Sequence, residues 1–311
     1  MTEPRNSLKV AILGSGNIGT DLLIKVLRSH YLDCSVFLGR NLSSAGMTKA
    51  LSLGVKVSAD GVDYITKNPD CCDLVFDATS AKSHLIHAPI LKKLNKKVIN
   101  LTPAPVGFMS VPSVNMKESI LEQNINMITC GGQASIPVAY AIGQTQKDIE
   151  YIEVISSISS RSAGPATRQN IDEYIGITEI ALKNFSGAHR TKAILNLNPA
   201  EPCVDMQTTI FAKVNAPDLG KLDGILSGLF AKVQEYVPGY EVILGPLMEN
   251  GLIVVMVRVR GLGDYLPVYA GNLDIINCAA IAIAQEYAKS NRNWLENGKR
   301  AIEASLPIGE R

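Results

Sequence analysis

No charge of one sign dominates this sequence. Its 30 lysine and arginine residues balance 29 aspartate and glutamate residues, and the formal net charge is +1. Such a balance gives no electrostatic attraction to nucleic acids or to membrane surfaces. No apolar run is long enough to cross a bilayer, and the short polar stretch 1–9 has no signal-peptide core. We therefore expect a cytoplasmic protein that acts without nucleic acid and without a membrane.

Paired cysteine motifs are also absent. The six cysteines form no C-x-x-C pair, which argues against a structural zinc site, and we expect no bound metal. Cys71 and Cys72 are adjacent and poorly placed to bridge each other, and cysteines of cytosolic proteins usually remain thiols. With 46% hydrophobic and 19% charged residues over 311 positions, the chain resembles an ordinary globular protein that is long enough for two domains.

Strand and helix patterns alternate in the first part of the chain. Apolar runs typical of buried strands occur at residues 8–13, 34–38, 73–77, 97–101 and 126–129. Helical spacing of apolar residues separates several of these runs, as at 47–53 and 84–94. This alternation is typical of an α/β fold. It predicts a Rossmann-type nucleotide domain over residues 1–129, with helices on the faces of a mostly parallel sheet.

The pattern changes after Gln146. Strands are predicted at residues 151–159, 194–197, 208–212 and 252–259, and helices at 171–185 and 219–236. These elements indicate an α+β catalytic and dimerisation domain over residues 130–271, with one sheet covered by helices. A strongly apolar helix is predicted at 272–290. We expect the segment 272–311 to return to the nucleotide domain.

A glycine-rich loop follows the first predicted strand. Gly14-x-Gly16-x-x-Gly19 lies between a strand and a helix, which is the context of a dinucleotide-binding loop. Gly14 would permit the tight turn, Gly16 would let the pyrophosphate approach, and Gly19 would let helix and strand pack closely. The amides at the helix start would then bind the pyrophosphate charge. The alternative is a tight turn with a structural role alone.

The choice of cofactor is open at the end of the second strand. A carboxylate usually binds the adenosine ribose there, but this chain has Arg40, Ser43 and Ser44, which could receive a 2′-phosphate instead. Arg40 could equally be a solvated loop residue, so both NAD and NADP remain possible. Thr79 follows the strand 73–77 at the carboxyl edge of the sheet. It could contact the cofactor, or Thr79 or Ser80 could cap the next helix.

Cys130 lies between the apolar run 125–129 and a helical pattern at 133–143. A thiol at such a strand-to-helix turn faces the positive end of the helix dipole, which favours the thiolate. Gly131 and Gly132 would let backbone amides approach an oxyanion. The alternative is a small buried hydrophobic residue, which is the usual role of a cysteine.

A nucleophilic thiolate beside a nicotinamide cofactor predicts the oxidation of an aldehyde. The thiolate forms a thiohemiacetal, hydride leaves to the nicotinamide, and an acyl thioester remains for water, phosphate or coenzyme A to release. A phosphorylating enzyme would use a histidine base, but His189 lies in a polar stretch typical of an exposed loop. His84 and His87 could bind a metal from one helix face. No third ligand is evident, however, and a solvated face is the simpler interpretation.

Five stretches carry a resemblance to a known family. They are Gly14–Leu27, Ile128–Pro137, Ser160–Tyr174, Leu197–Pro202 and Tyr265–Ile275. The chain resembles the acylating (CoA-acetylating) acetaldehyde dehydrogenases, which work beside a 4-hydroxy-2-oxovalerate aldolase in aromatic hydrocarbon catabolism. The resemblance covers nearly the whole chain. It implies a semialdehyde-dehydrogenase-like fold, NAD with some tolerance of NADP, coenzyme A as co-substrate, and a homo- or hetero-oligomer that could receive acetaldehyde from the aldolase.

The resemblance also implies a set of site residues. The cysteine that forms the acyl intermediate in the family maps to Cys130. The family's cofactor contacts map to Ser15, Gly16, Asn17, Ile18, Ser162, Ala163, Gly164, Pro165, Ala166, Thr167, Arg168, Gln169, Asn170 and Asn272. The amide of Asn272 would face the nicotinamide.

Two departures from the family pattern bear on catalysis. Ala166 stands where the family has the second glycine of a GPGTR motif, and it adds a methyl group near the nicotinamide. Thr208 stands where the family has an aspartate, in a motif like MRDT, that is thought to tune the thiol or a proton transfer. Asp205 could substitute, although its odd offset along a strand directs it to the other face.

We therefore predict a CoA-acylating aldehyde dehydrogenase that oxidises acetaldehyde with NAD and coenzyme A to acetyl-CoA through a thioester on Cys130. Two alternatives remain. Thr208 raises the possibility of a nucleotide-binding homologue with altered catalysis. The altered loops raise the possibility of an NADP-dependent semialdehyde reductase of the same fold.

Overall fold

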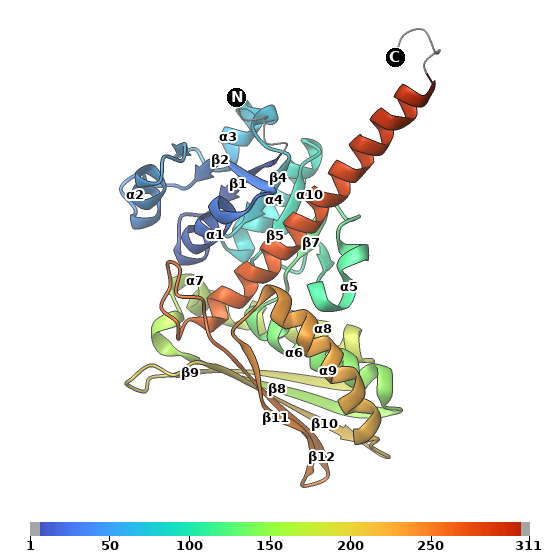
Figure 1. Cartoon of the computed structure of the whole chain (residues 1–311). Coiled ribbons are helices and arrows are strands. Elements are labelled where there is room, and N and C mark those ends of the chain that lie inside the picture. Colours follow the sequence, from blue (N-terminus) through green and yellow to red (C-terminus); the bar gives the residue numbers. More distant parts are fainter. Residues whose placement is uncertain (1–6, 306–311) are drawn as a thin grey trace.

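Two β-sheets organise the chain (Figure 1). The computed structural model describes residues 7–305, without the side chains of residues 165–166 and 292–305. The first sheet is parallel throughout, and its strands in spatial order are β3 (Val57–Ser58), β2 (Leu32–Leu38), β1 (Leu8–Leu13), β4 (Leu74–Asp77), β5 (Lys97–Asn100), β7 (Asn124–Asn126) and β6 (Phe108–Met109). The alternating pattern predicted a mostly parallel sheet, which is confirmed, and the observed strand order is doubly wound.

Helices alternate with these strands along the chain. They are α1 (Asn17–Arg28), α2 (Ala45–Ser52), α3 (Val62–Lys67), the short 3₁₀ helix η1 (Pro69–Cys71), α4 (Ala81–Lys93) and α5 (Pro112–Ser119). The four β1 residues from Val10 to Leu13 are fully buried, as expected of a central parallel strand covered on both faces.

The second sheet is mixed. Its strands in spatial order are β11 (Tyr240–Glu249), β12 (Leu252–Val259), β10 (Met206–Val214), β8 (Ile149–Ser159) and β9 (Arg190–Asn198). The helical elements of this half are α6 (Cys130–Thr145), the 3₁₀ helix η2 (Ser160–Ser162), α7 (Pro165–Gln169), α8 (Ile171–Ser186) and α9 (Leu219–Tyr236). Helices α6, α8 and α9 all lie on one face of the sheet (Figure 1).

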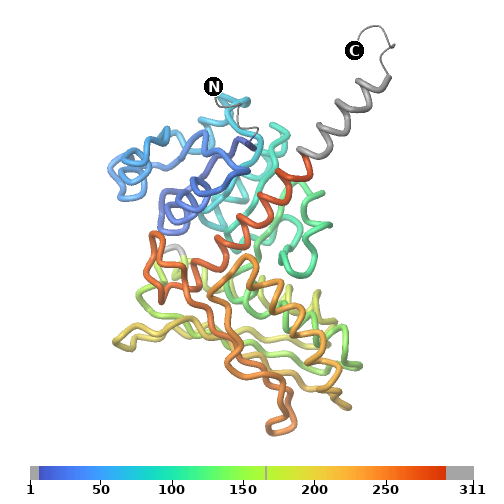
Figure 2. Tube along the Cα trace, in the orientation of Figure 1, coloured from blue at the N-terminus to red at the C-terminus, as the bar shows by residue number. Residues whose placement is uncertain are grey.

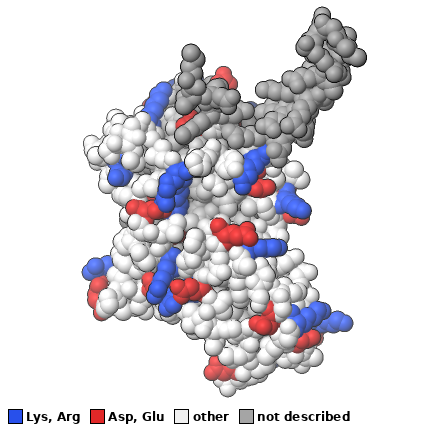
Figure 3. Space-filling model, in the orientation of Figure 1, with Lys and Arg blue, Asp and Glu red and all other residues white. Residues whose placement is uncertain are grey.

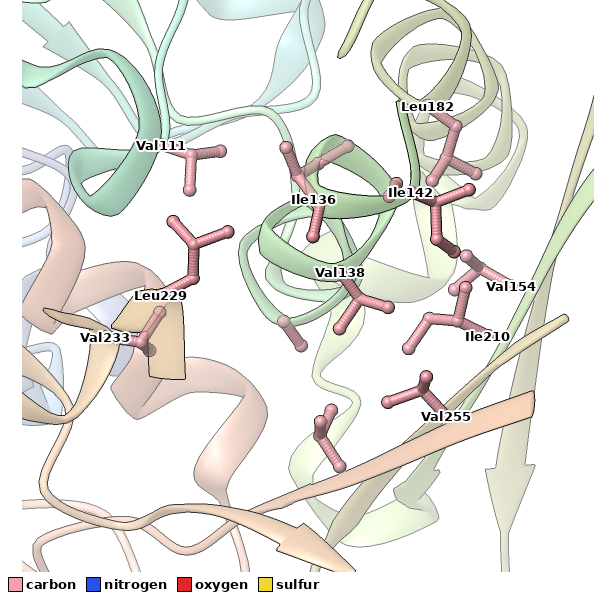
Figure 4. Packing of buried hydrophobic residues seen from close by; sticks show 14 of the residues in the cluster. Val111, Ile136, Val138, Ile142, Val154, Leu182, Ile210, Leu229, Val233 and Val255 are labelled. Atoms are coloured by element: carbon pink, nitrogen blue, oxygen red, sulfur yellow. The ribbon is translucent and has the colours of Figure 1, made fainter. Parts of the chain in front are cut away.

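The core of the second half forms between helix α6 and this sheet. Figure 4 shows Val138 and Ile142 of α6 facing Val154, Ile210 and Val255, which come from three different strands. All five side chains are buried. Burial of each side chain stabilises the fold by about 1.5–3 kcal/mol. The helix that begins at Cys130 is therefore held against the second sheet by its packing.

Helix α10 (Gly271–Ser305) joins the two halves. Figures 1 and 2 show it running from the second half along the side of the first half, which contains the parallel sheet. Ile276, Ala280 and Ile283 pack with Leu22 and Val26 of α1 in one buried cluster. The described part of the chain contains no helix that is both long and apolar enough to cross a membrane.

The predicted fold class is confirmed, but one predicted strand is misplaced. We expected a strand at 126–129, whereas β7 ends at Asn126. Ile128 has a left-handed φ of 63°, which ends extended structure, and its amide donates to Asn126 Oδ1 at 2.7 Å. The sequence analysis also missed β11, because that strand has an exposed edge and an irregular register.

Candidate active site

Cys130 is the first residue of α6 and follows a sharp turn. Helix α6 begins three residues before the predicted start at Gln133. The side chain of Thr129 caps it by accepting the Gly132 amide proton at 2.9 Å. The left-handed Ile128 turns the chain from the sheet into this helix. The cysteine therefore lies at the positive end of a 16-residue helix, close to the position that the sequence predicted.

Tyr174 of α8 defines the surroundings of the sulfur. Its hydroxyl lies 3.6 Å from Cys130 Sγ and accepts the Gly131 amide proton at 3.0 Å. A Cβ atom at Gly131 would lie 2.2 Å from that hydroxyl, so a glycine is required for this approach. The sequence analysis gave Tyr174 no role, although it ends the stretch Ser160–Tyr174 that carries the family resemblance, because its distance from the sulfur depends on how α8 packs beside α6.

The protonation state of the free enzyme differs from the expectation. Burial raises the pKa of Cys130 above its ordinary value of 9.0, and hydrogen bonds from Tyr174 and the Gly131 amide only partly offset this. The helix dipole was expected to give a thiolate, but no charged side chain of the described residues contributes to the pKa. At neutral pH this state therefore holds a thiol that must lose its proton to react.

A pocket opens between the two halves, beside the sulfur. Of the predicted site residues, five line it: Ile18, Cys130, Thr167, Asn170 and Asn272. The remaining lining residues are Ala78, Thr79, Ser80, Leu101, Thr102, Pro103, Ile128, Thr129, Tyr174, Leu273 and Ile276. The pocket thus joins the carboxyl edge of the first sheet to the N-termini of α6 and α10, where ligands bind in doubly wound folds.

Asn272 provides the clearest sign of a ligand. Its side chain is 1% exposed and its Oδ1 atom has no hydrogen-bond partner, although it lines the pocket. A buried carbonyl oxygen without a partner costs about 1–3 kcal/mol. A ligand that offers an N–H group, as the carboxamide of a nicotinamide does, would satisfy this oxygen.

The glycine-rich loop has the geometry that a pyrophosphate needs. Gly14 has a φ of 112°, which favours glycine, and a Cβ atom at Gly19 would lie 1.9 Å from the Gly14 carbonyl oxygen. A Cβ atom at Gly16, by contrast, would meet nothing within 4 Å, and Gly16 and Asn17 are exposed. No side chain caps the start of α1, so the first amides of this helix can face a phosphate. Ser15 accepts a hydrogen bond from Ser44 at 3.2 Å.

The segment 162–170 is only partly in the pocket. Ser162 and Ala163 are buried, and Gln169 is exposed. Arg168 donates to the Ala163 and Ser160 carbonyl oxygens at 3.0 Å and 3.1 Å, so it braces its own loop. A Cβ atom at Gly164 would meet nothing within 4 Å. The side chains of Pro165 and Ala166 lie outside the described residues, and so does the expected effect of the Ala166 methyl group.

Thr208 is connected to the cysteine, whereas Asp205 is not. Thr208 is fully buried on the helix-covered face of β10, and its hydroxyl lies 3.1 Å from that of Ser156. Ser156 in turn hydrogen-bonds to Tyr174. Asp205 accepts a hydrogen bond from Arg260 at 2.9 Å in an exposed ion pair. It therefore does not take the place of a carboxylate at position 208.

The two histidines of α4 do not form a solvated face, so that interpretation was wrong. Asp77 Oδ2 lies 2.9 Å from His84 Nδ1 and 2.8 Å from His87 Nδ1. Burial raises the pKa of Asp77, but hydrogen bonds from His84 and His87 outweigh it, so the pKa is lower than usual. Asp77 also accepts from the Thr79 amide, and Ser80 caps α4. The cluster therefore fixes the loop that forms one wall of the pocket.

Comparisons with known proteins agree with this geometry. The family described as prokaryotic acetaldehyde dehydrogenase, dimerisation, matches residues 130–267. An acetaldehyde dehydrogenase of Spirochaeta aurantia is 64% identical over 91% of this chain and 95% of its own. One of Pectobacterium atrosepticum is 54% identical over 92% and 97%. Aspartate semialdehyde dehydrogenase II of Vibrio cholerae shares the fold, with a TM-score of 0.57 and 15% identity over 91% of this chain and 97% of that chain. The chain belongs to the acetaldehyde dehydrogenase family.

Proposed function

We propose that this chain oxidises acetaldehyde with NAD and transfers the acetyl group to coenzyme A through a thioester on Cys130. One observation carries the proposal: the sulfur of Cys130 and the unpaired amide oxygen of Asn272 line the same pocket. The family membership supports the aldehyde dehydrogenase reaction and does not favour the two alternatives. The assignment of residues is our own.

The chain's residues account for the chemistry at the carbonyl carbon. The ionised sulfur of Cys130 forms a C–S bond, and the carbonyl oxygen becomes an oxyanion that backbone amides at the start of α6 can stabilise. The oxidised nicotinamide supplies the acceptor for the hydride. The thiol of coenzyme A would then attack the thioester: its sulfur takes the acetyl group, the C–S bond to Cys130 breaks, and the proton of the coenzyme A thiol passes to the departing sulfur of Cys130. The apolar residues Ile18, Ile128 and Ile276 exclude water that would otherwise release acetate.

The loop after β2 leaves both nicotinamide cofactors possible. Gly39 to Ser44 contain no carboxylate, and Arg40 is exposed. We propose NAD as the main cofactor on the family resemblance, with NADP as a weaker one because Arg40 can pair with a 2′-phosphate.

We further propose that two copies pair through the second sheet. Its face opposite the helices carries a row of adjacent, partly exposed residues across five strands, namely Ile194, Ile155, Thr209, Met256 and Leu244. Four of the five are apolar, and Figure 1 shows no helix over this face. The family description as a dimerisation domain supports this use. Figure 3 shows charges of both signs interspersed over the face of the molecule that it presents.

Two further parts of the proposal rest on the resemblance. A 4-hydroxy-2-oxovalerate aldolase would supply the acetaldehyde, and co-purification with such an aldolase would test this. Six free cysteines suit a reducing compartment, so we place the protein in the cytoplasm.

The reaction is tested by following reduced cofactor after acetaldehyde, NAD and coenzyme A are mixed with the protein. We expect a signal that requires coenzyme A and is lost in Cys130→Ala. Cys203→Ala, which removes another partly buried thiol, is the matched control and should retain activity. The acetylated peptide containing Cys130 should be detectable by mass spectrometry when coenzyme A is left out. Turnover by Cys130→Ala would refute the assignment.

A further inference from the structure

A line of hydroxyl groups runs from Cys130 into the second sheet. Tyr174 Oη lies 3.6 Å from the sulfur, Ser156 bonds to that hydroxyl, and Thr208 lies 3.1 Å from Ser156. Tyr174 is 7% exposed, Ser156 1% and Thr208 0%. These groups come from α8, β8 and β10, so side chains of three elements form one line of contacts that ends at the sulfur.

The hydrogen bonds that the Tyr174 oxygen accepts determine to which atom its own hydroxyl proton can be donated. The Gly131 amide is a donor only, so the Tyr174 oxygen accepts there. While Cys130 is a thiol, its Sγ donates to the Tyr174 oxygen at 3.6 Å. Once the sulfur is ionised, the hydroxyl of Ser156 can donate to the second lone pair of this oxygen instead. The phenol proton then has one acceptor left among these contacts, which is the sulfur once it has lost its own proton. Burial keeps the phenol neutral, because it raises the pKa of Tyr174 well above 10.0.

We propose that Tyr174 is a positioning residue for Cys130, whose hydroxyl donates to the ionised sulfur while Ser156 and Thr208 polarise that hydroxyl. Thr208 ends the line as a donor and cannot hold a negative charge. The line therefore stabilises the thiolate by donation alone, and the proton of Cys130 leaves through the pocket. This inference rests on the proposed role of Cys130 as the nucleophile.

Helix α8 is anchored so that Tyr174 keeps this place. Thr178 lies one turn along α8, and its hydroxyl is 2.8 Å from that of Thr129, the cap of α6. Tyr174 and Thr178 thus hold the first turn of α6 at two points. Neighbouring hydrogen bonds strengthen one another in a buried line of this kind. Removing the Thr208 hydroxyl should therefore weaken the hydrogen bond from Tyr174 to the ionised sulfur.

The test is the pH dependence of alkylation of Cys130 by iodoacetamide, followed on the Cys130 peptide by mass spectrometry. A hydrogen bond from Tyr174 stabilises the charged thiolate relative to the thiol. Tyr174→Phe should therefore slow alkylation at pH 7 about 10- to 100-fold and move the pH profile about one to two units upward. Thr208→Val, which keeps the shape and removes the donor, should give a smaller shift in the same direction. Tyr240→Phe is the matched control, because its buried hydroxyl also bonds α6, at the Ala134 carbonyl oxygen 2.9 Å away.

The outcomes separate this inference from the proposed function. Tyr240→Phe should lower the melting temperature and leave the alkylation profile in place. If Tyr174→Phe does the same, Tyr174 is structural and the inference fails, while the role of Cys130 stands. If Tyr174→Phe does not fold, Thr208→Val and Ser156→Ala decide: unshifted profiles in both overturn the proposal. Turnover by Cys130→Ala would refute the proposed function instead.

Discussion

The ammonium group of Lys25 on α1 lies 2.7 Å from the carboxylate of Asp274 on α10. It also lies 2.9 Å from Asp21 and 2.7 Å from Asp264, and the four side chains are at most 11% exposed. The three carboxylates could hold a metal ion by their spacing alone, but the ammonium already serves them as the cation. Because α1 follows the glycine-rich loop and α10 carries Asn272, this cluster holds two walls of the pocket together.

Replacing Lys25 by methionine should destabilise the protein by about 3–5 kcal/mol at pH 7, because Asp21 and Asp274 are left buried without their cation, whereas Asp264 keeps its ion pair with Arg28. Burial lowers the pKa of Lys25, but the charges of Asp274 and Asp21 outweigh burial and raise the pKa above its usual 10.5. The contribution of Lys25 to stability is therefore fully present below pH 10.5 and is lost only at higher pH. In the variant, Asp274, whose pKa burial already raises, should take up a proton more readily as the pH falls, and the deficit should shrink. Urea unfolding at pH 7 and at pH 5 measures this.

Lys289→Met is the control for that change. Lys289 is 45% exposed and lies 3.8 Å from Glu286, so its loss should cost no more than about 0.5 kcal/mol. If Lys25→Met lowers the free energy of unfolding no more than Lys289→Met does, the cluster does not hold α1 and α10 together.

Asp77→Asn should also destabilise the protein at neutral pH, by about 2–4 kcal/mol, because His84 and His87 lose a charged acceptor. The pKa of Asp77 is depressed, so the wild-type contribution is present above 3.8 and is lost as pH falls below that value. The gap between the variant and the wild type should therefore narrow in acid.

Denaturant midpoints at pH 7, 5 and 2.5 test the role of Asp77. Asp148→Asn is the matched control, because this exposed carboxylate also pairs with a histidine, His189, and should have little effect. A gap that stays constant down to pH 2.5 would contradict the assignment of the charge to Asp77.

The cluster at Asp77 shows where sequence reasoning stops. The strand and the helix around it are predictable, because both follow local periodicity. The sequence cannot show that His84 and His87, seven and ten residues further on, turn back toward the strand end. A helix face with two histidines is usually solvated, and only the packing of α4 on the sheet buries it.

The site residues also fall into those that the sequence predicts and those that only the structure shows. Gly14 and Gly16 are identifiable because a local motif requires them, and the cysteine is identifiable because a turn and glycines surround it. Tyr174 is not, because its role depends on the distance of α8 from α6. Thr208 is visible in the sequence only as a missing carboxylate. The structure shows that its hydroxyl is connected to the cysteine through Ser156 and Tyr174.

Asn272→Ala should weaken the binding of NAD about tenfold, because the unpaired Oδ1 atom would no longer accept a hydrogen bond from the ligand. Calorimetric titration of the free enzyme with NAD measures this without turnover. Asn196→Ala removes an exposed amide on the second sheet and should leave the affinity unchanged. Equal affinity of the Asn272 variant and the wild type would mean that the cofactor does not contact this oxygen.

Arg40→Ala should lower kcat/KM for NADP about tenfold and change that for NAD less than twofold, because only NADP offers a 2′-phosphate to the guanidinium group. Arg40 is exposed and directly follows Gly39, at the end of β2 where the adenosine ribose is expected. Lys49→Ala, a nearby exposed cation on α2, is the control and should spare both cofactors. An equal fall with both cofactors would place Arg40 on the adenine or the pyrophosphate rather than on the ribose.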